Sequence, residues 1–289
     1  MQRPVLVPLS QFRRVLILGV GNVGSAVASR LTALGVHVIG STTRAERLDE
    51  IAGVVAEAIV LKGEDSIAVA DAAYGCDAIV VTVSPPVTKA MTVAQRSETY
   101  RRVLVDTCRS ATAIHERVLF LSSISVYGAT TDDPVTEETV RSDLDDPSIV
   151  NFKAAEDAVL KASRGAVLRA PDIYGHPRDI DFAARIRFAH DAMGGSVPFA
   201  ANARFNRIHV DDAADAVVHV LGSDLTGTYN MVPEANWGTN EEVFGRIADQ
   251  KGLARLEFRD EIWTPVGSIS SNRLEATGFH FARVEQDVA

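Results

Sequence analysis

The clearest indication of the fold of this chain is the segment Val15-Leu16-Ile17-Leu18-Gly19-Val20-Gly21-Asn22-Val23-Gly24. Its first four residues are apolar and indicate a buried strand, and the residues from Asn22 onward fit a helix. Between strand and helix, three glycines follow the spacing GxGxxG, which is informative only in this setting. There the first glycine permits a tight turn, the second lets the backbone approach a pyrophosphate, and the third lets the helix pack on the strand.

This turn predicts a dinucleotide site, because a helix N-terminus offers free N–H groups and a positive dipole end to phosphates. The predicted ligands around the turn are Gly19, Gly21, Asn22, Val23 and Gly24. The alternative is a tight strand–helix turn that holds no ligand.

Outward from the turn, short β-branched runs alternate with helix-length segments, which is typical of βαβ units and a parallel sheet. Strands are expected at residues 15–18, 36–39, 58–61, 78–83, 118–121 and 166–168. Helices are expected at residues 22–34, 44–52, 87–115 and 151–163, the first of them closed by Gly35. The sequence therefore predicts an α/β protein with a Rossmann-type, doubly wound parallel sheet.

The end of the second strand indicates which dinucleotide is bound. An NAD site usually has a carboxylate there for the ribose 2′-hydroxyl. This chain instead has Gly40-Ser41-Thr42-Thr43-Arg44, with no carboxylate before Glu46. Hydroxyls at Ser41 and Thr42 followed by the guanidinium of Arg44 suit a 2′-phosphate, so NADP is favoured over NAD. The alternative is an ordinary polar loop that leads into a helix.

Composition excludes several classes of protein. The 289 residues include 29 Lys and Arg against 38 Asp and Glu, and the net charge of −9 argues against nucleic acid as the main partner. No apolar run is long enough to span a membrane, and residues 1–10 lack the apolar core of a signal peptide. Neither the cysteines nor the histidines show ligand spacing, so we expect a cytoplasmic protein without a metal site. These residues are Cys76, Cys108, His37, His115 and His190.

Four segments together resemble a known family. They are Phe120-Leu121-Ser122-Ser123-Ile124-Ser125-Val126-Tyr127-Gly128, Leu168-Arg169-Ala170-Pro171-Asp172-Ile173-Tyr174-Gly175, Asn206-Arg207-Ile208-His209-Val210-Asp211-Asp212 and Gly227-Thr228-Tyr229-Asn230. The chain resembles the extended short-chain dehydrogenase/reductases, the NAD(P)-dependent epimerase/dehydratase group, along almost its whole length.

The resemblance implies roles for several residues. Ser123, four residues before Tyr127, corresponds to the family's active-site hydroxyl, and Lys153 to the lysine of its Tyr-x-x-x-Lys motif. Thr82 and Ser84 follow the fourth strand, where the family passes the ribose and nicotinamide of the cofactor. The alternatives are a strand-end turn for Thr82 and Ser84, a structural hydrogen bond for Ser123, and a ribose ligand or exposed helix residue for Lys153.

The sequence departs from the family where the motif has its tyrosine. Ile149 stands at that position, and no tyrosine occurs between Tyr127 and Tyr174. In the family the lysine lowers the pKa of the tyrosine, which then exchanges a proton with the substrate while hydride moves to or from nicotinamide. Isoleucine has no proton to give.

Three explanations remain open. Another group could act as acid or base, among them Ser123, Ser125, Tyr127 or a residue of the acidic stretch Asp132–Asp146. The nicotinamide could react without needing a tyrosine. The protein could also bind the dinucleotide without turnover, as a sensor or regulatory module.

The resemblance also implies two domains. Residues 1–170 with about 206–229 would bind the dinucleotide, and residues 171–205 and 230–289 would form a smaller α/β substrate domain. A homodimer is expected by analogy. We expect an NADP(H)-binding oxidoreductase or epimerase-like enzyme for a small polar substrate. Scattered arginines could hold an anionic substrate, although most such side chains are solvated: Arg178, Arg185, Arg187, Arg204 and Arg207.

Overall fold

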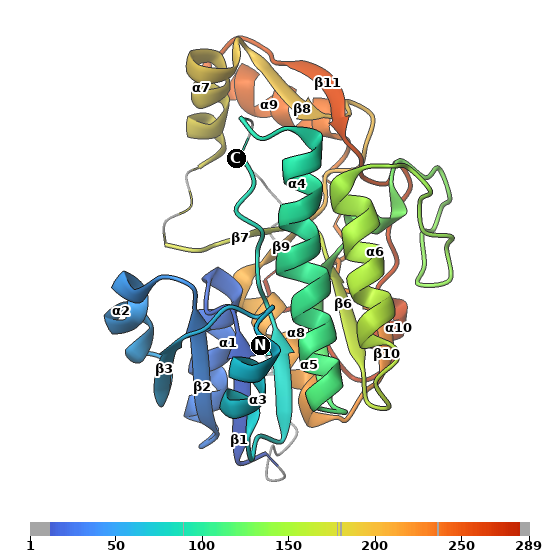
Figure 1. The fold of residues 1–289 in the computed structure, drawn as a ribbon. Coiled ribbons are helices and arrows are strands. Elements are labelled where there is room, and N and C mark those ends of the chain that lie inside the picture. Colours follow the sequence, from blue (N-terminus) through green and yellow to red (C-terminus); the bar gives the residue numbers. More distant parts are fainter. Residues whose placement is uncertain (1–11, 89, 178, 180, 236, 284–289) are drawn as a thin grey trace.

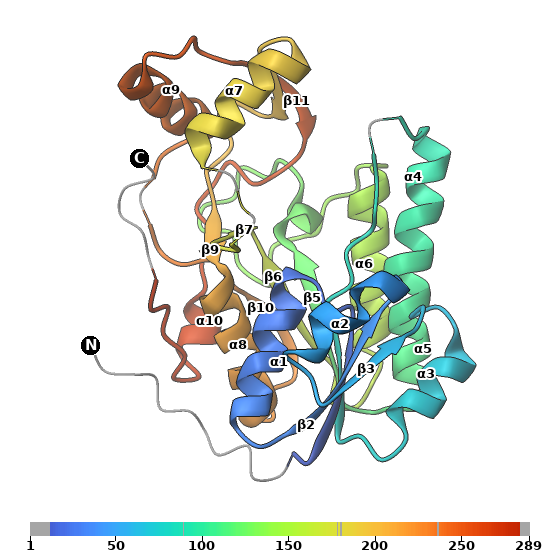
Figure 2. The ribbon, with the colours of Figure 1, turned by 90° about the vertical axis from the view of Figure 1, so that its left-hand side faces the viewer.

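A computed structural model of the protein describes residues 12–283, except residues 89, 178, 180 and 236. Its centre is a seven-stranded, wholly parallel sheet with the strand order β10-β6-β5-β4-β1-β2-β3 (Figure 1). Helices cover both faces of the sheet (Figure 2), which confirms the predicted Rossmann-type α/β fold. The order reverses between β1 and β4, and open α/β sheets bind their ligands at such a switch point.

The strands of this sheet are β1 (Arg14–Leu18), β2 (His37–Thr42), β3 (Glu57–Val60), β4 (Ala78–Val81), β5 (Val118–Ser123), β6 (Ala166–Ala170) and β10 (Gly227–Asn230). The helices around it are α1 (Asn22–Ala33), α2 (Leu48–Ala52), α3 (Ser66–Ala73), α4 (Val93–Tyr100), α5 (Thr107–Ile114), α6 (Pro147–Val159), α8 (Val210–Gly222) and α10 (Asn272–Glu275). Short irregular helices are η1 (Ala45–Arg47), η2 (Arg101–Asp106) and η3 (Ile124–Tyr127). A separate pair of strands is β7 (Asp172–Tyr174) with β9 (Arg207–His209).

The sheet divides the apolar interior into two cores. Val15 and Ile17 of β1 pack toward α1 and α8, whereas Leu16 and Leu18 pack toward α3, α5 and α6. Successive side chains of a strand point to opposite faces, so a sheet covered on both sides needs apolar residues at every position. This is why the strands read as continuous apolar runs in the sequence.

The long helix predicted at residues 87–115 is wrong in its first part. Helix α4 begins only at Val93, where Thr92 and Gln95 form a reciprocal capping box. The helix then passes through one π-helical segment, η2, before it continues as α5. The cap explains the later start, because it satisfies the first N–H groups at a position that the apolar pattern does not mark.

Two further helices within the first 170 residues differ from expectation, and none of the helices α7 to α10 after them was expected. Helix α6 begins at Pro147, four residues before the predicted start, because Asp146 accepts the N–H groups of Ser148 and Ile149. Helix α3 was not predicted at all. It starts after Asp65, which caps it through the N–H of Ala68, and its small apolar residues show little amphipathic contrast.

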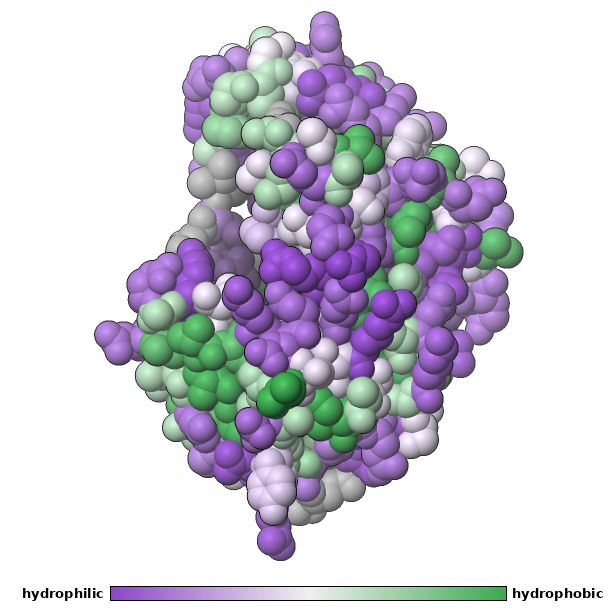
Figure 3. Space-filling model, viewed as in Figure 1, coloured by the Kyte–Doolittle hydropathy of each residue, from purple (hydrophilic) through white to green (hydrophobic). Residues whose placement is uncertain are grey.

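One edge of the sheet is apolar and open to solvent. Strand β3 is the last strand on this side, and Val60 at its end is 51% exposed. Ile67 of the neighbouring α3 is also exposed, and Figure 3 shows hydrophobic surface over this region. The opposite edge is β10, which pairs with β6.

A second group of elements lies at the top of Figures 1 and 2, which we call the small lobe. It consists of α7 (Phe182–Met193), β8 (Ser196–Phe199), α9 (Asn240–Lys251) and β11 (Glu257–Ile262). Strands β8 and β11 are parallel neighbours. The small lobe has its own aromatic core, which contains Phe205, Trp237 and Phe244. It therefore packs on side chains that the central sheet does not share.

The structure tests the expectation about a membrane span but not the one about a signal peptide. No helix within residues 12–283, as far as they are described, is long and apolar enough to cross a membrane. Residues 1–10, on which the expectation about a signal peptide rests, lie outside the described residues.

Candidate functional site

The glycine-rich turn is built from close backbone contacts. Gly19 has a φ of +94°, and a Cβ atom there would lie 2.9 Å from the backbone of Val83. Its N–H donates to Ser41 Oγ at 3.1 Å, and its carbonyl accepts from Thr82 Oγ1 at 2.8 Å. The ends of β1, β2 and β4 are thereby tied together at the switch point of the sheet.

The other two glycines of the turn have contrasting surroundings. A Cβ on Gly24 would lie 2.4 Å from the carbonyl oxygen of Gly19, so only glycine lets α1 pack this closely. A Cβ on Gly21 would meet nothing within 4 Å. Gly21 is also the N-cap of α1, and no side chain caps the helix. The first N–H groups of α1 therefore have no side-chain acceptor, and the space over Gly21 is open, which is the arrangement that binds an anion.

The residues expected at the adenosine end divide into two groups. Ser41 and Thr42 are buried, and their hydroxyl oxygens accept the backbone N–H groups of Gly19 and Arg44. These two hydroxyls thus fix the turn and the loop after it. Arg44 is exposed at the surface. It can still reach a ligand, whereas Ser41 and Thr42 already have partners.

Arg47 is a basic residue beside the turn that sequence reasoning missed. Its guanidinium donates to the carbonyl oxygen of Val20 at 3.1 Å and pairs with Glu50 at 2.9 Å. Arg47 lies within the helix expected at residues 44–52, three residues after Arg44, and this spacing was the available signal for a second basic residue here. Arg47 therefore holds the glycine turn itself, in addition to the exposed Arg44 that the sequence predicts as a cofactor ligand.

The serine-rich end of β5 forms a short turn. Ser123 Oγ accepts the N–H of Ser125 at 3.1 Å and caps η3. Ser84, which the resemblance places beside the ribose and nicotinamide, is not part of this turn and lies exposed after β4. Ser125 Oγ is buried and has no hydrogen-bond partner among the described residues. The turn thus carries one hydroxyl oxygen that accepts a backbone N–H and another that is unsatisfied.

Tyr127 lies inside the protein. Its hydroxyl donates to Asn230 Oδ1 at 2.6 Å and accepts from Arg169 at 2.7 Å. Burial raises the pKa of Tyr127 despite the opposing effect of Arg169, so its phenol stays protonated at neutral pH. A phenol enclosed in this way does not reach a substrate, which removes Tyr127 from the possible replacements for the missing tyrosine.

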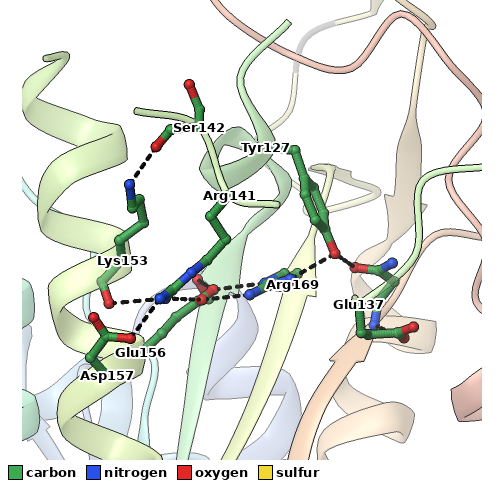
Figure 4. A network of polar contacts seen from close by, with 10 residues as sticks. Tyr127, Glu137, Arg141, Ser142, Lys153, Glu156, Asp157 and Arg169 are labelled. Carbon is green, nitrogen blue, oxygen red and sulfur yellow. Dashed lines mark hydrogen bonds and ion pairs between the residues drawn. The ribbon is translucent and has the colours of Figure 1, made fainter. Parts of the chain in front are cut away.

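Helix α6 presents the departure from the family motif. Ile149 is only 1% exposed, one helical turn before Lys153. The Lys153 ammonium donates to the main-chain carbonyl oxygen of Ser142 (Figure 4). Within the described residues, no hydrogen bond joins Lys153 to Ser123. The two predicted catalytic side chains therefore each contact a different neighbour.

Behind Lys153 lies a buried ionic network that the sequence reasoning missed (Figure 4). Glu156 has no exposed surface and accepts from Ser122, from Arg141 and twice from Arg169. Burial lowers the pKa of Arg169, but the hydrogen bonds and charge of Glu156 outweigh this and raise it. An arginine within the apolar strand Ala166–Ala170 was the signal, because a buried guanidinium requires an acidic partner.

The arginines of the second half do not share one environment. Arg207 is 5% exposed, and its guanidinium lies 3.8 Å from the ring centre of Tyr174 and 4.5 Å from that of Phe182. Arg207 is thus an exception to the expectation that most of these arginines are solvated, because it stacks on aromatic rings. Arg185 pairs with Asp172 at 3.4 Å. Arg178 lies outside the described residues.

Histidines and acidic residues show no metal-like grouping in the described part of the chain, where no three His, Cys, Asp or Glu residues are arranged to hold an ion. His209 instead caps α8 by accepting the N–H of Asp211 at 3.1 Å. Its ring packs edge-on against Tyr174. These contacts give His209 a structural role.

Sequence comparison identifies one family. The model of the NAD dependent epimerase/dehydratase family matches residues 15–231, which include the glycine turn, the end of β5 and Lys153. A search of curated proteins found no significant match.

Comparison of structures gives the same fold. The Bordetella bronchiseptica enzyme WbmG, solved with NAD, has a TM-score of 0.74 at 17% identity over 98% of this chain and 93% of WbmG. The dTDP-glucose 4,6-dehydratase DesIV from Streptomyces venezuelae, also with NAD, has a TM-score of 0.72 at 20% identity over 94% and 92% of the two chains. UDP-glucuronic acid 4-epimerase from Bacillus cereus, with NAD, has a TM-score of 0.71 at 14% identity over 94% of each chain. At such identities the likeness shows the shared fold alone.

Proposed function

Because the chain belongs to the NAD dependent epimerase/dehydratase family, we propose that it is an NADP(H)-binding oxidoreductase or epimerase-like enzyme that acts on a small polar substrate. The observation that carries the proposal is the uncapped N-terminus of α1 with open space over Gly21. The pyrophosphate would bind there, to the backbone at Asn22, Val23 and Gly24.

The preference for NADP rests on the end of β2. No carboxylate follows this strand before Glu46, and Arg44 is exposed two residues after the end of β2. A guanidinium favours the 2′-phosphate of NADP, whereas NAD sites use a carboxylate for the 2′-hydroxyl. The solved relatives named above carry NAD, so this preference would be a departure by this chain.

A bound nicotinamide would supply hydride transfer. The chain's own part would be to orient it and to move a proton. Lys153 would bind the ribose hydroxyls. After Tyr127 is set aside, the candidates for the acid or base are Ser123, Ser125 and a residue of the acidic stretch Asp132–Asp146. Ile149 favours a second candidate function, a dinucleotide sensor without turnover. Loss of measured turnover in Ser123→Ala or Lys153→Ala would support the enzyme.

The proposed substrate follows from structures of similar fold, and the proposed assembly from exposed apolar side chains. Two structures of similar fold contain a bound nucleotide or nucleotide sugar, WbmG with UDP and MoeE5 with UDP-glucose. We propose a small polar substrate between the carboxyl ends of the strands and the small lobe, where this fold class binds ligands. A homodimer would use the outer face of α4 and α6, where Val93 and Val150 are exposed. We propose a cytoplasmic location, consistent with two cysteines that lie outside any disulfide.

Arg44→Ala tests the proposed cofactor. It should weaken NADPH binding by about tenfold to a hundredfold and leave NADH binding unchanged, since a hydrogen bond to a charged group contributes about 1.5–3 kcal/mol. Arg47→Ala is the matched comparison. Arg47 holds the carbonyl of Val20 in the glycine turn, so its loss should weaken the binding of NADPH and of NADH by the same factor. Calorimetric titration measures both. Equal losses of NADPH and NADH binding in Arg44→Ala would refute the 2′-phosphate site.

A further inference from the structure

The Lys153 ammonium is held by a carbonyl whose position is itself fixed. Ser142, which provides this carbonyl, donates its N–H to the Val126 carbonyl at 2.8 Å, and its Oγ accepts the N–H of Leu144 at 3.2 Å. Gly128, with a φ of +59°, lies against it, because a Cβ there would be 2.6 Å from Ser142 Oγ. The Ser142 carbonyl therefore has little freedom to follow the lysine.

Arg141, the residue before Ser142, binds helix α6 at three points. Its guanidinium lies 3.2 Å from Glu156 Oε2, 2.8 Å from Asp157 Oδ1 and 3.4 Å from the main-chain oxygen of Lys153 (Figure 4). Arg141 thus joins the acidic stretch Asp132–Asp146 to the same turn of α6 that carries Lys153. Since Glu156 is fully buried, this contact is poorly screened by solvent.

The rest of the acidic stretch is anchored elsewhere. Glu137 accepts the N–H of Asn230 at 2.7 Å, and Val135 is bonded through its backbone to Ser268 at 2.7 Å. Glu138 pairs with Arg273 at 3.0 Å on the surface. Loss of Arg141 would therefore leave the stretch attached at these points and would weaken mainly the hold on the segment beside Lys153, where the bond from Ser142 to Val126 remains.

We propose that Arg141 is a positioning residue for Lys153, acting through the Ser142 carbonyl. The ammonium has three N–H donors, and the Ser142 carbonyl accepts one of them in a fixed direction. Two donors then remain for the hydroxyls of a dinucleotide ribose, and the flexible lysine stem is ordered before the cofactor arrives. The inference rests on the proposed function, because it takes the ribose as the partner of Lys153.

Amine labelling followed by mass spectrometry tests the positioning in the free protein. An acylating reagent should label Lys153 several-fold faster in Arg141→Met than in the parent, with the exposed Lys62 as internal reference. Arg273→Met, which removes an arginine contact with Glu138 in the same stretch, should leave the Lys153 rate unchanged. Asp157→Ala, at an exposed residue, removes one contact of Arg141 and should label Lys153 faster than the parent but more slowly than Arg141→Met. This variant tests the proposal even if Arg141→Met does not fold.

A double-mutant cycle on NADPH affinity separates positioning from a general structural role. Arg141→Met should weaken binding about tenfold, roughly the effect of one charge-assisted hydrogen bond. In a Lys153→Met background the same change should cause no further loss, because Arg141 acts through Lys153. Losses that multiply in the double variant, or an unchanged Lys153 labelling rate in both Arg141→Met and Asp157→Ala, would overturn the proposal. If the parent binds no dinucleotide, the proposed function fails, and the labelling rates still decide whether Arg141 positions Lys153.

Discussion

Gly21 and Gly24 lie in one turn, yet the space around them differs completely. A side chain at 21 would point into open space, and one at 24 would strike the carbonyl of Gly19. At the scale of single residues, one glycine therefore leaves room for a ligand and the other lets the fold close. Sequence spacing alone gives both residues the same weight.

We predict opposite outcomes for alanine at these two positions. Gly21→Ala should change the free energy of unfolding by no more than about 1 kcal/mol, the difference between Gly and Ala at an N-cap, and should weaken dinucleotide binding at least about tenfold. Gly24→Ala should lower the free energy of unfolding by about 1–3 kcal/mol through overpacking. Urea unfolding and calorimetry measure the two effects. A stable Gly24→Ala variant would contradict the close packing of α1.

The buried charge of Glu156 leads to a second prediction. Glu156→Gln leaves the guanidinium of Arg169 without its counter-ion in the interior, so it should lower the free energy of unfolding by about 3–5 kcal/mol. Asp249→Asn is the control, because Asp249 pairs with Arg255 on the surface, where solvent screens the ion pair, and its loss should have little effect on stability. Denaturant unfolding of both variants gives the comparison. Similar losses in the two would show that burial of the Glu156 pair has no special effect.

At the scale of elements, patterns of apolar residues located six strands of the central sheet, but they missed the short strands of the two smaller sheets and placed the starts of two helices poorly. The predicted strand at 15–18 differs from β1 by only one residue. The strand is easy to recognise because both faces of the sheet are buried, so its residues form a continuous apolar run. The starts of α4 and α6 depend on side-chain caps at Thr92 and Asp146. Such caps are local hydrogen bonds and leave no periodic signal, which is also why α3 went unnoticed.

The cap of α6 can be tested directly. Asp146→Ala removes the acceptor for the N–H groups of Ser148 and Ile149 and should lower the free energy of unfolding by about 0.5–2 kcal/mol. Asp146→Asn keeps a side-chain oxygen and should retain most of the stability. Thermal or urea unfolding distinguishes them. A loss as large in Asp146→Asn as in Asp146→Ala would mean that charge, and not the cap, stabilises this end of α6.

At the scale of the whole molecule, ionic contacts join the first helix to segments near the end of the chain. Arg30 of α1 pairs with Asp211 and Asp215 of α8, and Arg283 also pairs with Asp211. Burial raises the pKa of Asp211, but the hydrogen bond and charge of Arg30 outweigh this and lower it. The folded form therefore favours the ionised carboxylate more strongly than the unfolded chain does.

This contact predicts a pH dependence. Because the folded pKa of Asp211 is lowered, its contribution is complete above the unfolded value of about 3.9 and is lost as the pH falls through the folded pKa. Arg30→Met should therefore be about 1–3 kcal/mol less stable than the parent at pH 7, with a difference that shrinks below about pH 4. Unfolding free energies measured from pH 3 to 7 follow it. Arg109→Met, at an exposed arginine, serves as control, and a constant Arg30→Met difference would contradict the account.

The sequence was enough for the class of fold and for the glycine turn, since both follow from local patterns. It could not show that Ser41 and Thr42 use their hydroxyls on the backbone, or that Arg47 reaches Val20. Nor could it show the contact between Ser142 and Lys153, because that contact depends on how a long loop folds back. Long-range polar contacts of this kind have no signature in the spacing of residues.

The central claim is that the open N-terminus of α1 binds a dinucleotide, with Arg44 selecting NADP. Calorimetric titration of the unmodified protein with NADP⁺, NADPH, NAD⁺ and NADH tests it most directly. We predict binding of both NADP forms, at least about tenfold tighter than the NAD forms. NAD forms that bind as tightly as NADP forms would contradict the role of Arg44. No binding of any of the four would contradict the dinucleotide site itself.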